Sequence, residues 1–337
     1  MTTTGNPKEG TARPLPPLVQ LGRPSRVPRA QVSLTINDQP VTVDEGTTLL
    51  GAAATIGVEV PTLCYLETLR PVNVCRLCVV EVEGARVLAP ACSRAVEPGM
   101  KVHTDSPRVK HSRKLVLEML ASSVDLSTTP GMPELLETYA CEPERFGPPA
   151  PTAAAGERDA AIAGHHVATE PGFAATVAQP VKIDNDLYVR DYSKCVLCYK
   201  CVEACGPDHQ NTFAIAVAGR GFNARISTEM AIPLPGSACV YCGNCIAVCP
   251  TGALMAKPEH DLRVAGTWDE SSQQVTDTIC PYCGVGCTLS LHVQDGRIVK
   301  ATSPLDHDIT LGNLCVKGRF GWQFVQSRAP ESNGDGG

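Results

Sequence analysis

The first alternation of apolar and polar residues along the chain predicts a small sheet. The segments QVSLTIN and QPVTVD alternate on either side of Asn37 and Asp38, a pair typical of a hairpin turn. TTLLGAAATIG then predicts a short helix that ends at Gly57. CVVEVEG and RVLAPAC form a second strand pair around Gly84, and MKVHT adds a last strand. We therefore expect residues 31–106 to fold as a sheet that grips one helix.

Two further elements follow from the pattern. Ser106 is a suitable N-cap and Pro107 a suitable first residue for a helix over SPRVKHSRKLVLEMLASS. Much later, TLSLHVQDGRIVKATS alternates as a hairpin with its turn at Asp295 and Gly296. Between them, residues 147–182 are rich in Ala, Pro and Gly without any period, which predicts a linker.

Composition favours several small lobes over one large core. The chain has 337 residues, of which 4% are aromatic, 28 are Pro and 29 are Gly. The formal net charge is -6 and no long basic run occurs, so a nucleic-acid partner is not expected. Residues 1–30 read as a flexible Pro-rich arm without the apolar core of a signal peptide, and no stretch reaches the roughly 20 apolar residues of a membrane span. We expect a soluble, cytoplasmic protein.

Seventeen cysteines change this picture more than any other residue type. In a reducing compartment they are poor candidates for disulfides, which leaves metal ligands, nucleophiles or buried small residues. No Walker A, G-x-S-x-G or H-E-x-x-H pattern accompanies them, and GRGFNAR at 219–225 lacks the context of a phosphate-binding loop. The spacing of the cysteines therefore decides their role.

The first group has the spacing C-x10-C-x2-C-x13-C. Its members are Cys64, Cys75, Cys78 and Cys92. The central C-x2-C and the distant fourth cysteine match plant-type [2Fe-2S] ferredoxins, although the first gap is longer than their C-x4-C. A zinc site would favour two C-x2-C knuckles, and only one is present. The segment resembles β-grasp [2Fe-2S] ferredoxins, and VPTLCYLETLRPVNVCRLCVVEVEG resembles the N-terminal domain of the large iron-sulfur subunit of complex I, NAD-linked formate dehydrogenases and related hydrogenases.

Two further runs, CVLCYKCVEAC and CVYCGNCIAVCP, each have the spacing C-x2-C-x2-C-x3-C of two-cluster bacterial ferredoxins, where the fourth cysteine serves the other cluster. The crossed assignment gives one [4Fe-4S] cluster to Cys195, Cys198, Cys201 and Cys249. It gives a second one to Cys239, Cys242, Cys245 and Cys205. Eight thiolates at these intervals fit tetrahedral zinc poorly. Gly206 replaces the Pro expected after the first run, which removes no ligand.

The last group has the spacing C-x2-C-x3-C-x27-C. Its members are Cys280, Cys283, Cys287 and Cys315. The predicted hairpin would return Cys315 to the other three, which suits a [4Fe-4S] cluster on a small, mostly β lobe. TICPYCGVGC and GNLCVKGRFGW resemble the N-terminal cluster domain of molybdopterin oxidoreductases. That resemblance implies that Lys317 lies between the cluster and a pterin, whereas without it Lys317 would be an ordinary surface lysine.

Residues 107–146 depart from the resembled family. There the helix leads into a His-plus-three-Cys [4Fe-4S] motif, but SSVDLSTTPGMPELLETYACEPERFG retains only Cys141, and His111 lies too far upstream. One cluster of the relatives is therefore expected to be missing. Four groups of four account for sixteen of the 17 cysteines, with Cys141 left as a plain thiol. One [2Fe-2S] and three [4Fe-4S] clusters, hence fourteen irons, are expected.

The expected architecture is a multi-lobed α+β chain without a complete active site of its own. It comprises a flexible arm (1–30), a β-grasp [2Fe-2S] domain (31–106), a helical segment with the degenerate His-Cys region (107–146), a linker (147–182), a two-cluster ferredoxin-like domain (183–262), a [4Fe-4S] molybdopterin-oxidoreductase-type domain (275–328) and a tail (329–337).

The order of these domains resembles the front end of the catalytic subunit of NAD-linked formate dehydrogenases, whose chain continues into a molybdopterin domain. The resemblance implies an electron-transfer subunit between a separately encoded molybdopterin-bearing catalytic subunit and a flavin and NAD-binding subunit of the diaphorase type. Two alternatives stay open. One is the electron-transfer subunit of an NAD-linked hydrogenase or a complex-I-like NADH oxidoreductase, and the other is a zinc-rich structural protein.

Overall fold

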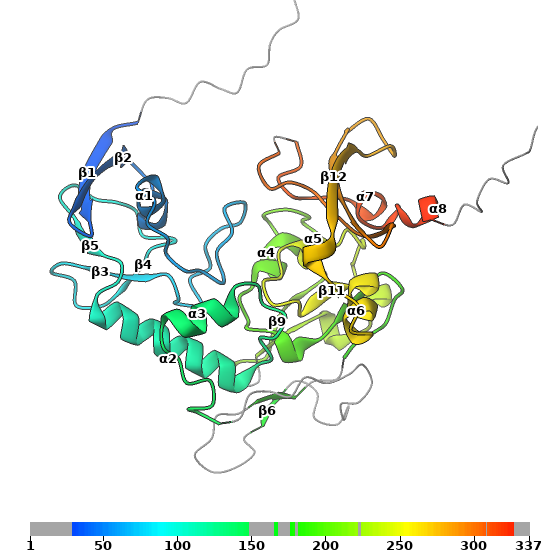
Figure 1. Ribbon diagram of the computed structural model, residues 1–337, viewed down its shortest axis with the longest axis horizontal. Coiled ribbons are helices and arrows are strands. Elements are labelled where there is room, and N and C mark those ends of the chain that lie inside the picture. The colour runs from blue at the N-terminus through cyan, green and yellow to red at the C-terminus, as the bar shows by residue number, and fades with distance from the viewer. Residues whose placement is uncertain are drawn as a thin grey trace, which may run out of the picture.

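The computed structural model describes residues 29–147, 165–167, 176–178, 181–221, 224–307 and 309–326. In these ranges the three blocks of cysteines lie on separate lobes, the first beside the second and the third on top of the second (Figure 1). Residues 1–28 of the expected arm, most of the expected linker and the expected tail lie outside the described residues. No helix in the described part is long and apolar enough to cross a membrane.

The first lobe is a mixed five-stranded sheet that packs one helix. Its strand order is β2-β1-β5-β3-β4, in which only β1 and β5 run parallel. The strands are β1 (Gln31–Ile36), β2 (Gln39–Asp44), β3 (Val79–Val82), β4 (Ala89–Pro90) and β5 (Lys101–His103), and the helix is α1 (Leu49–Thr55). The predicted hairpin is confirmed, because Asn37 and Asp38 both have positive φ and pair β1 with β2.

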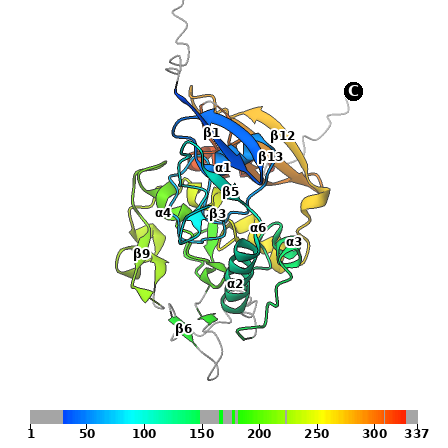
Figure 2. The same cartoon turned by 90° about the vertical axis from the view of Figure 1, so that its left-hand side faces the viewer.

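The predicted capped helix is also confirmed as α2 (Pro107–Ser123), with the Ser106 side chain accepting a hydrogen bond from the Val109 N–H. Figure 2 looks onto the first lobe and shows α2 below its sheet. The region expected to hold a degenerate cluster motif forms a loop and then α3 (Met132–Thr138). Leu63, Leu77, Leu117 and Met132 join in one buried apolar cluster that fixes α2 and α3 to the first lobe.

The second lobe holds short elements around a core of aromatic and aliphatic residues. Its strands pair as β8 with β11 and β9 with β10. The elements are β8 (Tyr188–Arg190), α4 (Lys200–Cys205), β9 (Ala216–Ala218), β10 (Arg225–Ser227), α5 (Asn244–Ala247), β11 (Leu254–Ala256) and α6 (Lys257–Val264). The segment GRGFNAR at 219–225 connects β9 to β10, although residues 222 and 223 lie outside the described ranges.

The third lobe is a three-stranded antiparallel sheet with two short helices. The strand order is β12-β13-β14. The elements are β12 (Gln274–Ile279), β13 (Thr288–Gln294), β14 (Arg297–Thr302), α7 (Val316–Phe320) and α8 (Gln323–Gln326). The β13–β14 hairpin turns at Asp295 and Gly296, as predicted. The sequence reasoning did not anticipate β12, which is exposed along its whole length. A separate pair, β6 (His165–Val167) with β7 (Thr176–Ala178), lies within the expected linker.

Candidate metal centres

The structure brings the first four cysteines together at the end of the first lobe. The Cys64 thiol hydrogen-bonds Cys75, and the Cys92 thiol hydrogen-bonds Cys78. The first contact lowers the pKa of Cys75 to about 5, and the second lowers the pKa of Cys78 to about 7. Cys92 also interacts electrostatically with the other three sulfurs. We call these residues, Cys64, Cys75, Cys78 and Cys92, group 1.

A buried arginine of α2 supports the loop of group 1. Arg113 is 2% exposed, and its guanidinium donates to the Leu77 carbonyl at 3.0 Å and to the Val79 carbonyl at 2.9 Å. A third bond, at 2.8 Å, reaches the Tyr139 hydroxyl. Arg113 therefore links the Cys75–Cys78 loop to α2 and to the end of α3. Asn73, which precedes this loop, accepts hydrogen bonds from the Cys92 thiol at 3.2 Å and from the Ser93 hydroxyl at 2.7 Å.

The two ferredoxin-type runs exchange their fourth cysteines in the fold. Cys195 interacts electrostatically with Cys198 and Cys249, and Cys201 with all three of them. Cys242 interacts with Cys239 and Cys205, and Cys245 with all three of those. We call Cys195, Cys198, Cys201 and Cys249 group 2. We call Cys239, Cys242, Cys245 and Cys205 group 3. Burial raises the pKa of Cys195 to about 12 and that of Cys198 to about 11.

The loops of groups 2 and 3 repeat the same backbone conformation. Leu197 and Tyr199 have positive φ in the first run, and Tyr241 and Gly243 have positive φ at the equivalent positions of the second. These turns aim backbone N–H groups at the sulfurs: the Leu197 N–H donates to Cys195 and the Tyr241 N–H to Cys239, both at 3.4 Å. Such N–H···S bonds stabilise a thiolate that carries negative charge.

The last four cysteines also converge. Cys287 interacts electrostatically with Cys280, Cys283 and Cys315, and the Cys280 N–H donates to the Cys287 carbonyl at 2.8 Å. These four cysteines form group 4. Cys280 is buried, but Cys283 and Cys315 are exposed. Group 4 therefore lies at the surface of the third lobe, in contrast to the more enclosed groups 1 to 3.

Lys317 lies on α7, which begins directly after Cys315. Its ammonium is 5.9 Å from the centre of the Tyr282 ring, and the Tyr282 hydroxyl donates to the Gly321 carbonyl at 2.7 Å. Lys317 is exposed, so its charge faces out of the lobe next to group 4.

Group 1 adjoins group 2 across the boundary between the first and second lobes. The loop between Cys64 and Cys75 packs Leu66 and Leu69 against Ala204 of α4. The Arg70 guanidinium donates to the Asp208 carboxylate at 2.8 Å, and the Arg70 N–H donates to it at 2.7 Å. The long first gap of the C-x10-C motif thus forms the contact between the two lobes. We call residues 64–75 the docking loop.

Groups 3 and 4 are joined by Arg319 of α7. This residue is 5% exposed, and its guanidinium donates to the Cys242 carbonyl at 3.1 Å and to the Asn244 side-chain oxygen at 3.3 Å. Burial lowers the pKa of Arg319 to about 10, while the nearby sulfurs of Cys242 and Cys245 oppose that change. The same Asn244 oxygen accepts a bond from the Leu314 N–H at 3.1 Å. The loop of group 3 therefore holds the segment on which Cys315 lies.

The donor sets fit iron-sulfur clusters. All seventeen cysteines are free thiols, and sixteen of them lie in the four groups. Within the described ranges, no three His, Cys, Asp or Glu side chains converge on the position of one metal ion. Cluster ligands need no such convergence, because at most two thiolates of one cluster bind the same iron. Buried Lys200 and Arg319 have cysteine sulfurs among their main electrostatic partners, as the surroundings of an anionic cluster require.

Cys141 stands apart from the groups. Its thiol contacts the Lys114 carbonyl at 3.9 Å, and burial raises its pKa, with Glu118 adding to that effect. No cysteine is among its electrostatic partners in the described chain. In the described chain Cys141 therefore lies outside the four groups.

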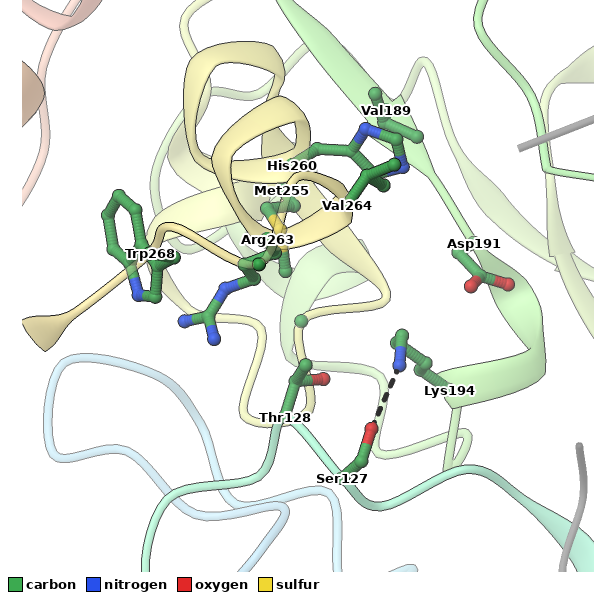
Figure 3. Close-up of a pocket in the computed structure, with 12 residues that line it drawn as sticks. Ser127, Thr128, Val189, Asp191, Lys194, Met255, His260, Arg263, Val264 and Trp268 are labelled. Atoms are coloured by element: carbon green, nitrogen blue, oxygen red, sulfur yellow. Dashed lines mark hydrogen bonds between the residues drawn. The ribbon is translucent and has the colours of Figure 1, made fainter. Parts of the chain in front are cut away.

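A cavity of about 480 Å³ lies between the loop after α2 and the second lobe. Figure 3 shows Lys194 pointing at Ser127, with Arg263 and Trp268 on the other side. Both cations are already paired: Lys194 with the buried Asp125 carboxylate, and Arg263 with Glu259 and Glu270. No cysteine lines the cavity. Its cations therefore serve structural ion pairs.

Sequence reasoning missed three buried cations near the cysteine groups, Arg113, Lys200 and Arg319. One signal was available for Arg113, because Val109, Arg113 and Leu117 follow one another at intervals of four on a helix. An arginine in such an apolar stripe indicates a buried guanidinium with specific partners. Lys200 and Arg319 lie next to cysteine motifs, but only the packing of the lobes shows which sulfurs they approach.

Comparison with protein families gives three matches. Residues 29–107 match the 2Fe-2S iron-sulfur cluster binding domain, residues 236–255 match a 4Fe-4S binding domain, and residues 273–327 match the molybdopterin oxidoreductase Fe4S4 domain. The chain therefore contains both [2Fe-2S] and [4Fe-4S] binding domains. These matches cover groups 1, 3 and 4, apart from Cys205.

Whole-chain relatives extend the similarity. The chain is 35% identical over 301 residues to the NADPH-Fe(3+) oxidoreductase subunit alpha of Geobacter sulfurreducens, and 31% identical over 306 residues to an NADH-quinone oxidoreductase subunit of Rhizobium meliloti. Each alignment covers 88% of this chain and 32% of the relative. A putative formate dehydrogenase of Staphylococcus haemolyticus is 26% identical, with 87% and 31% covered. The chain thus spans about a third of the length of these curated relatives.

A solved structure supports the fold. A chain of an NAD+-reducing [NiFe]-hydrogenase in its H2-reduced state superimposes with a TM-score of 0.53 at 23% identity. The match covers 68% of this chain and 88% of that chain. At this identity the likeness concerns the fold alone.

Proposed function

Over 88% of its length this chain belongs with the N-terminal, iron-sulfur part of the family of NADH-quinone oxidoreductase iron-sulfur subunits and formate dehydrogenase-like proteins, and from that premise we propose that it is an iron-sulfur electron-transfer subunit. Group 1 would hold one [2Fe-2S] cluster, and groups 2, 3 and 4 would each hold one [4Fe-4S] cluster. Bound clusters of this kind exchange single electrons with little movement of their thiolate ligands. The β-grasp assignment of the first lobe and the domain boundaries above belong to the same proposal.

The observation that carries this proposal is that the cysteine groups are neighbours in one row, in the order 1, 2, 3 and 4. Cys198 of group 2 interacts electrostatically with Cys75 of group 1, and Cys201 with Cys245 of group 3. Arg319 then links group 3 to α7, the helix that directly follows Cys315 of group 4. The docking loop places group 1 beside group 2, so the absent His-Cys motif leaves no gap between them.

The two ends of the row suggest the partners. Group 4 lies at the surface with Lys317 beside it, within a segment that matches a molybdopterin oxidoreductase domain. We infer that this end faces a molybdopterin-bearing catalytic unit of the formate dehydrogenase type, and that Lys317 approaches the pterin. Group 1, at the other end, would face a flavin and NAD-binding subunit of the diaphorase type.

Formate-dependent reduction tests the proposed partner. The purified chain is mixed anaerobically with its molybdopterin-bearing partner, formate is added, and the visible and EPR spectra are followed. We expect all clusters to become reduced, and Cys283→Ser to abolish that reduction because it removes a ligand of group 4. Clusters that stay oxidised in the wild-type mixture would refute the formate assignment.

The alternative partner is a hydrogenase or a complex-I-like NADH oxidoreductase, which is supported by the similarity to the NADH-quinone oxidoreductase subunit of Rhizobium meliloti. In that case group 4 would lie off the electron path. Cys283→Ser would then leave turnover with H2 or NADH unchanged. The same variant therefore separates the two candidates.

Metal analysis tests the clusters themselves. The four groups predict about fourteen irons per chain, and Cys92→Ser should lower that number by about two because group 1 would hold a two-iron cluster. Cys141→Ser is the matched control and should leave the iron content unchanged. A colourless protein that contains zinc in place of iron would contradict the proposal.

A further inference from the structure

Lys200 is a buried cation between two of the cysteine groups. It is 9% exposed and is the first residue of α4, between Cys198 and Cys201 in the chain. Its main electrostatic partners are the sulfurs of Cys198 and Cys249 in group 2 and those of Cys64 and Cys75 in group 1, with no carboxylate among them. The ammonium therefore lies within range of two groups that belong to different lobes.

The packing of the two lobes fixes this position independently of the charges. Leu69 of the docking loop packs against Ala204, which lies one turn after Lys200 on α4. The Thr68 carbonyl of the same loop is 3.1 Å from the His209 ring nitrogen, and Arg70 pairs with Asp208. Contacts at and just after Ala204 therefore hold α4, the helix that begins with Lys200, against the docking loop.

A positive charge at such a site changes the energy of reduction. An added electron makes a cluster more negative, and a nearby cation stabilises that form more strongly in a protein interior than in water. The other buried cations near this boundary differ, because Lys194 is neutralised by Asp125 and Arg190 by Asp184. The field of Lys200 is not cancelled in this way.

We propose that Lys200 is a shared positioning charge that raises the reduction potentials of the group 1 and group 2 clusters together. A single residue would thus shift two successive electron carriers in the same direction, so that the difference between their potentials changes little. This inference rests on the proposed function, since it requires both clusters to be bound.

The test is an EPR-monitored redox titration of the full, cluster-loaded chain. In Lys200→Met, the reduction of the group 1 and group 2 clusters should each become about tenfold less favourable, which is about 59 mV for a one-electron couple. The equilibrium constants for reduction of the group 3 and group 4 clusters should change by less than about twofold. Lys200→Arg keeps the charge and should restore both potentials.

The matched control is Lys257→Met, which removes a lysine of the same lobe that is paired with Asp261. It should leave all four potentials unchanged. Lys200→Gln provides a second neutral variant with a polar side chain, in case Met at this site lowers the iron content. The shared-charge role is overturned if neither potential moves, if only one moves, or if all four move alike.

The assignment is also overturned if both neutral variants fail to hold the clusters while Lys200→Arg holds them, because the charge would then serve assembly and not potential. Failure of the proposed function has a different signature. In that case the wild-type chain itself lacks the iron content or the EPR signals of the four clusters, whatever residue stands at position 200.

Discussion

Apart from Lys200, the buried cations of the described chain occur in two kinds of setting. Lys194 and Arg190 are paired with the carboxylates of Asp125 and Asp184, the usual arrangement for a buried charge. Arg113 and Arg319 instead donate to carbonyl, hydroxyl and amide oxygens around the cysteine loops. A guanidinium with several fixed donors can hold a loop of irregular backbone in this way.

Arg113→Met should therefore loosen the loop of group 1. The substitution leaves the Leu77 and Val79 carbonyls buried without their donor, which we expect to cost about 3 kcal/mol of the free energy of unfolding. The EPR signal of the two-iron cluster should fall relative to those of the [4Fe-4S] clusters. Spin quantitation of the reduced, cluster-loaded chain measures this ratio.

Arg108→Met is the matched control for that variant. Arg108 lies on the same helix, but its side chain is 48% exposed and pairs with Glu81 at 3.5 Å. Its loss should cost less than about 1 kcal/mol, as for other exposed ion pairs. An equal loss of the group 1 signal in both variants would show that the effect comes from the helix and not from the loop bonds.

Glu118 gives the first lobe a defined dependence on pH. Burial alone would raise the pKa of this carboxyl, but the Glu142 N–H and the Arg145 guanidinium outweigh burial and lower it. A lowered folded pKa means that the carboxylate stabilises the fold fully above the unfolded value of about 4.3 and loses that effect as the pH falls through the folded value.

Glu118→Gln should thus be destabilised by about 1–2 kcal/mol at neutral pH, since the amide loses the ionic part of these contacts. The difference from wild type should be constant between pH 5 and pH 7 and should shrink below about pH 4. Urea unfolding followed by circular dichroism at several pH values measures it. A difference that instead grows as the pH falls would contradict the sign of the pKa shift.

At the scale of the elements, the packing of α7 against the second lobe depends on Gly243. Gly243, in the loop of group 3, has a φ of +71°, and a Cβ there would clash with Arg319 Cδ and lie 3.1 Å from Phe320 Cζ. Gly243→Ala should combine backbone strain with this clash, at a cost of about 2–5 kcal/mol. Hydrogen exchange should therefore become faster in α7, because the helix can no longer seat against the second lobe.

Gly266→Ala separates strain from clash. Gly266 has a φ of +70°, but nothing lies within 4 Å of its virtual Cβ. This control should show only the backbone cost of about 1–3 kcal/mol and unchanged exchange in α7. If the two variants behave alike, the close approach of Arg319 to Gly243 has no role in holding the third lobe.

Local elements of this fold could be predicted from the sequence, but their assembly could not. The Asn37–Asp38 hairpin, the Ser106 cap and the Asp295–Gly296 turn follow from side-chain chemistry within a few residues. By contrast β12 escaped the prediction, because its residues alternate in character while both of its faces are exposed. The docking loop was visible only as an unusually long gap, since its apolar contacts lie on another lobe.

The candidate site divides in the same way. Cysteine spacing predicted four groups, and the structure brings the sixteen thiols together in the same four sets. The assignment of each set to a cluster is a proposal. The residues that surround the sulfurs, such as Lys200 and Asn73, were beyond prediction because their partners are distant in sequence. The lack of a His-Cys motif was visible in the sequence, yet only the fold shows Ser127 and Thr128 lining a cavity there.

At the scale of the whole molecule, removal of iron should loosen the contacts between lobes. Without clusters, burial keeps the thiols of Cys198, Cys242 and Cys245 protonated, so Lys200 and Arg319 lose much of the negative charge beside them at a cost of about 3–5 kcal/mol each. Anaerobic chelation should therefore accelerate hydrogen exchange in α4 and α7 more than in the β1–β2 hairpin. Mass spectrometry of the chelated and loaded chains compares these segments.

Arg319→Met tests the electrostatic origin of that loosening. The variant should be less stable than wild type when loaded, because the Cys242 carbonyl loses its donor, but chelation should then change exchange in α7 less than it does in wild type. If chelation loosens both proteins equally, the lobes are held by the clusters as cross-links and not by the compensation of buried charge.

The exchange of fourth cysteines between groups 2 and 3 also has a consequence for biosynthesis. Under the proposed ligation, the first cluster of the second lobe cannot be closed until Cys249 has left the ribosome, and the other needs Cys205, which emerged long before its partners. Neither half can mature alone. We therefore expect nascent chains that are stalled before residue 249 to acquire the two-iron cluster but neither complete ferredoxin-type cluster, so that iron loading follows the order of translation.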